Sequence, residues 1–145
     1  MEKITIIYGP ARSGKTRLAE DIAANKNTVW LCGRNYFKSR SNFKLQELTD
    51  KTELIVVDDI PPKFTLEAMA EFAAGEIFYH IKGVASFVTI PRPKVIFTLD
   101  VEEFKFPEGA SIDARFDFIR LESIDDYFKE YERLFGHVHP EITIP

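Results

Sequence analysis

Two glycines, a lysine and a threonine stand at a fixed spacing near the start of the chain. Residues 9–16 read G-x-x-x-x-G-K-T and follow an apolar run. In this pattern the backbone N–H groups of a glycine-rich loop surround phosphate, the lysine reaches the β- and γ-phosphates, and the threonine hydroxyl binds Mg²⁺. The alternative is a glycine-rich turn with an exposed lysine. We expect an ATP–Mg²⁺ site with Lys15 as a catalytic residue, Thr16 as a metal ligand, and these cofactor-binding residues: Gly9, Pro10, Ala11, Arg12, Ser13, Gly14, Lys15, Thr16 and Arg17.

A pair of carboxylates follows a second apolar run. The stretch "LIVVDD" carries the chain through a predicted strand and ends in Asp58 and Asp59. Open α/β sheets bind ligands at the carboxyl ends of their strands. This looks like a Walker B motif, in which Asp58 binds Mg²⁺ and Asp59, as a catalytic residue, orients or deprotonates the attacking water. The alternative is a pair of polar residues that merely end a strand.

The elements that must position these groups alternate between strands and helices. Continuous apolar runs predict strands that are covered on both faces, and the alternation predicts an α/β three-layer sandwich around a mainly parallel sheet. We expect one domain over residues 1–145, with a small β-hairpin over 76–90. The predicted strands are 3–8, 28–32, 53–59, 94–100 and 116–122, and the predicted helices are 15–26, 65–75 and 123–136, the last with Ser123 as its N-cap.

Composition restricts the function classes. The formal net charge is −4, so the surface as a whole does not favour nucleic acid, and a DNA contact would need a local patch or several subunits. A single cysteine, Cys32, allows no internal disulfide, and no apolar run reaches the length of a membrane span. We therefore expect a soluble, cytoplasmic protein without a membrane partner. His137 and His139 are spaced as in some zinc sites, but without a third ligand nearby they favour a simple C-terminal tail.

The order of the motifs resembles the AAA+ ATPases and, more closely, the superfamily 3 helicases. The order is the phosphate loop, the apolar run with two aspartates, "KVIFTLD" at 94–100, and "SIDARFDFIRLE" at 111–122. The resemblance implies a P-loop NTPase sheet of the additional-strand type. It also places Asp100, a candidate catalytic residue, where a γ-phosphate-sensing asparagine is usual, with Thr98 as the nearby alternative. Many relatives have glutamate in place of Asp59, and the shorter side chain argues against fast hydrolysis.

Two further roles come from the same resemblance. Arg115 falls where an arginine completes the active site of a neighbouring subunit; the alternative is a surface arginine paired with Asp113 or Asp117. His80 and Lys82 fall in the segment where a hairpin grips single-stranded DNA, with an ordinary solvated hairpin as the alternative. From the residues given, we expect neither the separate C-terminal helical lid of AAA+ proteins nor the segment that precedes the loop in superfamily 3 helicases.

The leading interpretation is a Mg²⁺-dependent ATPase coupled to DNA replication or remodelling. We expect it to act as a homo-oligomer or as a subunit of a larger ATPase assembly. Two alternatives stay open: a small nucleoside or metabolite kinase, and an ATP-binding subunit with little hydrolysis.

Overall fold

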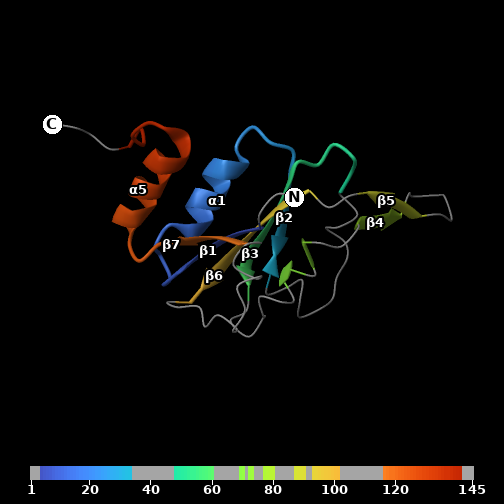
Figure 1. Cartoon of the computed structure of the whole chain (residues 1–145), viewed down its shortest axis with the longest axis horizontal. Coiled ribbons are helices and arrows are strands. Elements are labelled where there is room, and N and C mark those ends of the chain that lie inside the picture. Colours follow the sequence, from blue (N-terminus) through green and yellow to red (C-terminus); the bar gives the residue numbers. More distant parts are fainter. Residues whose placement is uncertain are drawn as a thin grey trace.

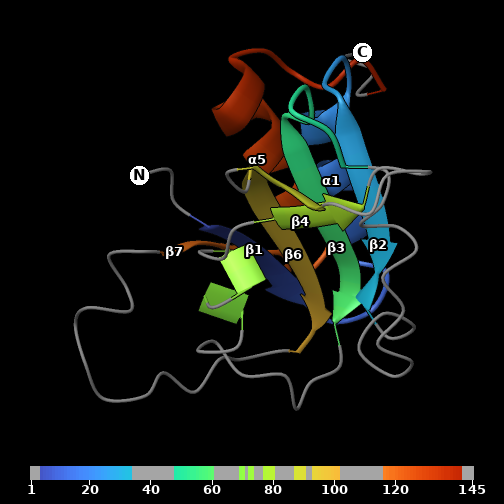
Figure 2. The same ribbon diagram turned by 90° about the vertical axis from the view of Figure 1, so that its right-hand side faces the viewer.

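A five-stranded parallel sheet forms the centre of the protein (Figures 1 and 2). Its strands are β1 (Ile4–Gly9), β2 (Thr28–Cys32), β3 (Leu54–Ile60), β6 (Lys94–Asp100) and β7 (Phe116–Arg120), in the order β2-β3-β6-β1-β7. All four neighbouring pairs are parallel. The computed structural model describes residues 4–33, 48–60, 69–70, 72–73, 77–80, 87–90, 93–101 and 116–141, with only the backbone described for 77–80 and 87–90.

The strand order places β6 between β1 and β3. β6 is therefore the additional strand that the motif order implied, because it separates the strand before the phosphate loop from the strand that carries the two aspartates. The register aligns Gly9, the last residue of β1, with Asp100, the last residue of β6. The carboxyl ends of β1, β3 and β6, which carry the predicted site residues, thus lie together at one edge of the sheet.

Two helices cover one face of the sheet, as Figure 1 shows. They are α1 (Lys15–Ala23) and α5 (Ile124–Phe135), and their apolar side chains pack with Ile7, Val56 and Ile96 of the sheet. Residues 69, 70, 72 and 73 cover the opposite face, where they contact a second core cluster that includes Ile6 and Phe97. The predicted three-layer α/β fold is confirmed.

The ends of the helices differ slightly from the prediction. α1 stops at Ala23 rather than at residue 26, and Asn25 adopts a left-handed backbone with φ of 67°. Asparagine tolerates this conformation better than most residues, so it can end a helix. At the start of α5, Ser123 is the N-cap residue but its side chain makes no capping hydrogen bond. The Asp126 carboxylate instead accepts a hydrogen bond from the Glu122 N–H at 2.9 Å.

A separate two-stranded antiparallel sheet confirms the predicted hairpin. It pairs β4 (Ile77–His80) with β5 (Phe87–Ile90). Figure 1 shows this hairpin at the opposite end of the molecule from α5. Residues 81–86, which include Lys82, lie outside the described residues.

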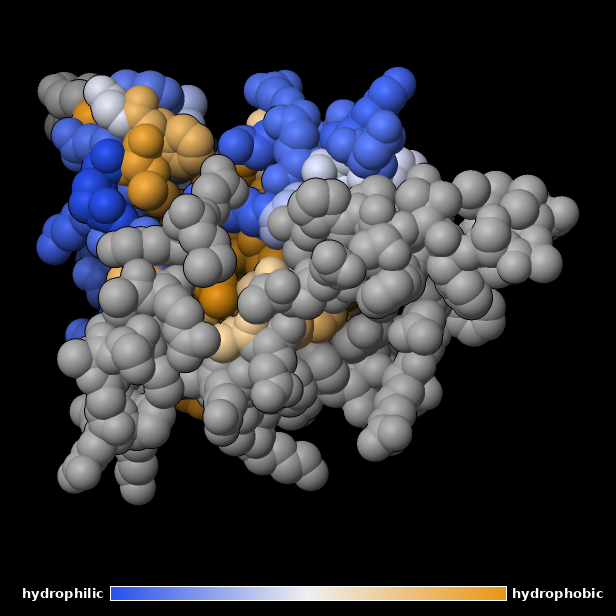
Figure 3. Space-filling view, turned by 45° about the vertical axis from the view of Figure 1, so that its right-hand side comes forward, coloured by the Kyte–Doolittle hydropathy of each residue, from blue (hydrophilic) through white to orange (hydrophobic). Residues whose placement is uncertain are grey.

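The described surface is mixed in character. In the view of Figure 3 its upper edge is hydrophilic, and apolar side chains gather at the upper left. The large apolar side chains that are exposed in the described part of the chain belong to α5 and the segment just after it: Ile124, Leu134, Phe135 and Val138. Among the described helices, none is long and apolar enough to cross a membrane.

Candidate nucleotide-binding site

The glycine-rich loop connects the end of β1 to the start of α1. Gly9 has a φ of 152°, and a Cβ at this position would lie 1.8 Å from the carbonyl oxygen of Leu121. No side chain fits there, so the loop can begin its turn only with glycine. Arg12 also has a positive φ, of 64°, which turns the backbone within the loop. Such turns direct successive N–H groups inward, as an anion site requires.

Gly14 forms the junction between the loop and α1. It is the N-cap residue of the helix, in a left-handed conformation with φ of 95°. A Cβ here would lie 2.9 Å from the Cβ of Tyr127 on α5. The first N–H groups of α1 have no partner within the helix, and they carry the positive end of its dipole. The loop therefore presents anion-binding groups while α5 packs directly behind it.

Lys15 folds back into this loop. Its ammonium donates to the carbonyl oxygen of Pro10 at 2.5 Å and to the hydroxyl of Ser13 at 3.3 Å. It also forms an ion pair with Asp100, with 2.8 Å between Nζ and Oδ1. The Lys15 side chain is only 7% exposed, whereas that of Asp100 is 43% exposed. The predicted phosphate-binding lysine thus lies inside the loop, with a carboxylate beside it.

Thr16 and Asp58 meet although they are far apart in the sequence. The Thr16 hydroxyl donates to Oδ1 of Asp58 at 3.0 Å. Hydroxyl and carboxylate oxygens are the ligands that Mg²⁺ takes in proteins, usually alongside phosphate oxygens and water. The two residues predicted as metal ligands therefore form a donor set that fits Mg²⁺.

Thr98 connects the two aspartates. Its hydroxyl donates to Oδ1 of Asp58 at 2.5 Å and accepts the backbone N–H of Asp59 at 2.8 Å. Thr98 is 2% exposed, so this arrangement lies at the buried side of the site. The side chain that was expected as an alternative phosphate sensor instead holds the Asp58 carboxylate and the backbone of Asp59.

A β-bulge produces this arrangement. Val57 pairs with Phe97 and Ile60 pairs with Leu99, so two residues of β3 lie opposite Thr98 alone. Asp59, within the bulge, has a φ of 60°. The bulge shifts the inward–outward alternation of the strand by one residue, and Ile60 consequently packs in the same cluster as Val57. The sequence gives no sign of the bulge, because "VVDDI" is equally typical of a regular strand.

Arg17, expected among the cofactor-binding residues, has its guanidinium engaged by the C-terminal segment. It forms an ion pair with Glu141 and lies 4.8 Å from the ring centroid of Tyr127 and 5.7 Å from that of Phe128. The hydrogen bond between Arg17 and Glu141 raises the pKa of Arg17 and lowers the pKa of Glu141. Because the guanidinium is engaged in this way, Arg17 would contribute to the proposed site through its backbone, in the first turn of α1.

Tyr127 joins α5 to α1. Its ring is fully buried, and its hydroxyl donates to the carboxylate of Asp21. Burial, with this hydrogen bond as the second cause, raises the pKa of Tyr127 above its usual value of about 10. No local sequence signal identifies the contact with Asp21, since the two residues are 106 positions apart.

His139 is not part of a simple tail. It is 8% exposed, and its ring packs against Tyr127, Phe128 and Tyr131 with centroids 4.5–5.6 Å away. Its Nδ1 accepts the N–H of Glu141. The described residues form no group of three or more metal-ligating side chains. The prediction of a tail is wrong for His139, because an aromatic stripe on α5 provides a surface for its ring.

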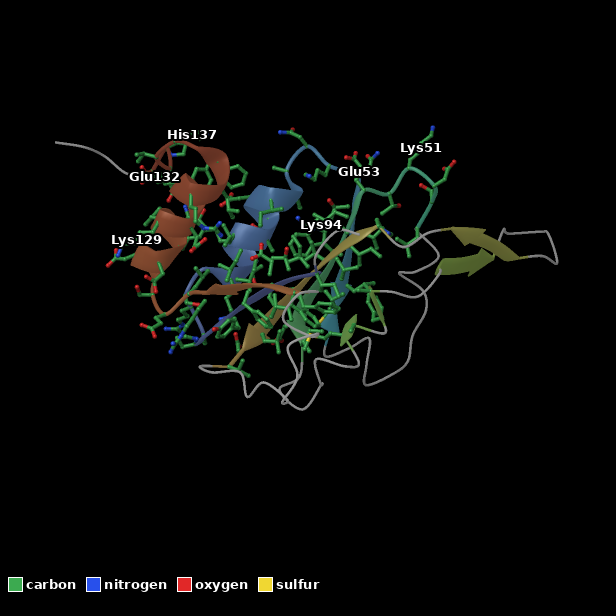
Figure 4. All side chains as sticks on the ribbon, viewed as in Figure 1. Lys51, Glu53, Lys94, Lys129, Glu132 and His137 are labelled. Carbon is green, nitrogen blue, oxygen red and sulfur yellow. The ribbon has the colours of Figure 1, made fainter. Side chains whose placement is uncertain are left out.

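Other predicted site residues are not brought into this cluster by the described structure. Arg115 and Lys82 lie outside the described residues, and only the backbone of His80 is described, at the end of β4. The residues labelled in Figure 4 lie away from this site. Lys51, Glu53 and Lys94 lie at the amino edge of the sheet, opposite the site, and Lys129, Glu132 and His137 lie on or beside α5.

Comparison with known proteins supports the fold alone. No protein-family model matches the chain, and no curated protein sequence is similar to it. Among solved structures, it is similar to the helicase of JCV, determined in complex with N-(4-(2-(thiazolo[5,4-c]pyridin-2-yl)phenoxy)phenyl)acetamide. The TM-score is 0.55 at 18% sequence identity, over 93% of this chain and 41% of the helicase chain, so this chain spans about two fifths of that protein's length. The likeness supports the α/β fold with its parallel sheet.

Proposed function

We propose that this chain binds ATP with Mg²⁺ at the loop formed by residues 9–16 and hydrolyses it. One observation carries the proposal. At the carboxyl edge of the sheet, the first two residues of α1 meet carboxylates from two strands: the Lys15 ammonium pairs with Asp100 of β6, and the Thr16 hydroxyl donates to Asp58 of β3. A loop of inward N–H groups with an ammonium and two oxygen ligands suits a triphosphate and its metal ion.

Each residue has a distinct role in the proposed reaction. Lys15 neutralises charge on the β- and γ-phosphates, and the N–H groups of the loop and of α1 orient the phosphate chain. Thr16 and Asp58 hold Mg²⁺, which, when bound, offsets the charge that develops during phosphoryl transfer. Asp59 orients the attacking water. Arg115 of a neighbouring subunit would stabilise the same charge, if the chain assembles into an oligomer.

The fold and the order of the motifs support a proposal for the biological setting. We propose that hydrolysis supports replication or remodelling of DNA, with His80 and Lys82 on the β4–β5 hairpin contacting single-stranded DNA and with several copies, or a larger ATPase assembly, forming the working unit. The similarity to a helicase fold supports this choice over a small-molecule kinase.

A second candidate is ATP binding with very little turnover. The ion pair between Lys15 and Asp100 favours it, because a carboxylate beside the phosphate-binding lysine opposes the build-up of negative charge there. The side chain of Asp59, which is shorter than the glutamate found in many relatives, also favours little hydrolysis.

Titration calorimetry with ATP and Mg²⁺ tests the proposed binding site. Lys15→Ala should weaken ATP binding by at least about tenfold, since hydrogen bonds to charged groups contribute about 1.5–3 kcal/mol each and 1.4 kcal/mol is tenfold. Lys129→Ala removes one exposed lysine on α5 and is the matched control. Equal ATP affinity in wild type and Lys15→Ala would overturn the proposed site.

Single-turnover release of phosphate separates the two candidates. If the chain hydrolyses ATP, Asp59→Ala should slow the release of phosphate. Equally slow release in wild type and variant would mean that Asp59 does not activate the attacking water. Transfer of phosphate to a small acceptor instead of water would indicate a kinase.

A further inference from the structure

The ion pair between Lys15 and Asp100 places a negative charge inside the proposed phosphate site. Oδ1 of Asp100 lies 2.8 Å from Nζ of Lys15, closer than the Ser13 hydroxyl at 3.3 Å. Together with the Pro10 carbonyl, three oxygens surround the ammonium. Two oxygens of the loop and one of β6 thus hold the Lys15 ammonium, the group that would bind phosphate oxygens in the proposed site.

Strand geometry fixes the position of Asp100. It is the last residue of β6, and its backbone is in register with Gly9, where the loop begins. Thr98, two residues earlier, points to the same face of the sheet and contacts Asp58 on that face. The carboxylate is therefore presented by the central strand of the sheet and does not depend on a surface loop.

The negative charge of Asp100 should change the affinity of the site for different nucleotides by different amounts. A carboxylate this close to Lys15 competes with any phosphate for the ammonium, and it repels a ligand more strongly as the ligand's charge near the lysine increases. The lysine of such a loop reaches the β- and γ-phosphates, so the γ-phosphate adds charge at this point. Asp100 is 43% exposed, so solvent screens part of the effect without removing it.

We propose that Asp100 is a resident counter-ion of Lys15 that weakens binding of the triphosphate more than binding of the diphosphate. Asp100 thereby lowers the preference of the site for ATP over ADP. The inference rests on the proposed nucleotide site and adds a specificity-determining residue to it.

The test compares ATP and ADP binding, each with Mg²⁺, in wild type and in Asp100→Asn. Asparagine keeps the size and shape of the side chain and removes its charge. The affinity for ATP should rise by about fivefold to tenfold, and that for ADP by about twofold, so the ATP/ADP affinity ratio increases. The gain in ATP affinity should be smaller at high salt, because the Lys15–Asp100 ion pair is partly exposed. Asp117→Asn, an exposed carboxylate on β7, changes the net charge equally and should leave the ratio unchanged.

The possible failures are distinguishable. If Asp100→Asn binds ATP more weakly than wild type, Asp100 assists binding and the inference is overturned. If both nucleotides gain equally, the carboxylate does not discriminate between them and the inference is also overturned. If neither wild type nor Asp100→Asn binds any nucleotide, while both unfold at similar temperatures, the proposed nucleotide site itself is wrong.

Discussion

At the residue scale, the Thr98 hydroxyl is the group on which the position of both aspartates depends. It is buried, it donates to Asp58, and it accepts the N–H of Asp59 within the bulge. A threonine at a strand end suggests contact with ligand, yet here both hydrogen bonds go to protein. Thr98 therefore acts through Asp58 as a positioning residue for the proposed metal ligand.

Replacing Thr98 with valine should show this role. The variant keeps the shape of the side chain but removes the acceptor of the Asp59 N–H and one of the two hydroxyl donors to Oδ1 of Asp58. We expect a loss of about 1–3 kcal/mol in the free energy of unfolding, measured in urea, and a higher Mg²⁺ concentration for half-maximal ATP binding. Thr98→Ser retains the hydroxyl and should restore the Mg²⁺ dependence. If valine shifts stability but leaves the Mg²⁺ dependence unchanged, the hydroxyl has only a structural role.

At the element scale, α5 supports the phosphate loop from behind. Tyr127 packs against Gly14, its hydroxyl bonds to Asp21 of α1, and Arg17 of α1 pairs with Glu141 after α5. Any shift of α5 would therefore reach the first turn of α1. The contact also explains why the N-cap of α1 is glycine, beyond the needs of a bound phosphate.

The raised pKa of Tyr127 predicts a pH dependence of stability. In the folded chain Tyr127 holds its proton above the usual value of about 10, while the unfolded chain releases it there. The contribution to stability is complete below about pH 10 and is lost as pH rises towards the folded-state pKa. Urea unfolding between pH 8 and 11.5 should show a steeper loss of stability for wild type than for Tyr127→Phe. Parallel curves for the two proteins would contradict this prediction.

At the scale of the whole molecule, one sheet with two covered faces favours cooperative unfolding. The two core clusters lie on opposite faces of the same five strands. A single domain of this size usually unfolds in one transition.

Thermal unfolding should accordingly give one transition that shifts with ligand. At an ATP–Mg²⁺ concentration about 100 times the dissociation constant, binding adds about 2.7 kcal/mol, which is a shift of several degrees in Tm. Lys15→Ala should show the same single transition without the shift. Two separate transitions in scanning calorimetry would contradict the expectation of one domain over residues 1–145.

Most of the elements were predictable from the sequence because their signals are local. Apolar runs rich in β-branched and aromatic residues predicted the five strands, and the spacing of Leu18 and Ile22 predicted α1, although its end came earlier than expected. The phosphate loop was predictable for the same reason, since its glycines, lysine and threonine lie within eight consecutive residues.

The phosphate-loop pattern, the paired carboxylates at a strand end and the alternation of strands and helices can all be predicted from the residues alone. Which of these groups meet depends on how the elements pack. Thr98 reaches Asp58 across 40 positions, and Tyr127 reaches Asp21 across 106. Tyr127 and Asp21 meet because α1 and α5 pack side by side on one face of the sheet. For Thr98 and Asp58 the physical reason is register: strand pairing, and a bulge of one residue, set which side chains share a face. Neither is encoded in the spacing of residues along a single strand.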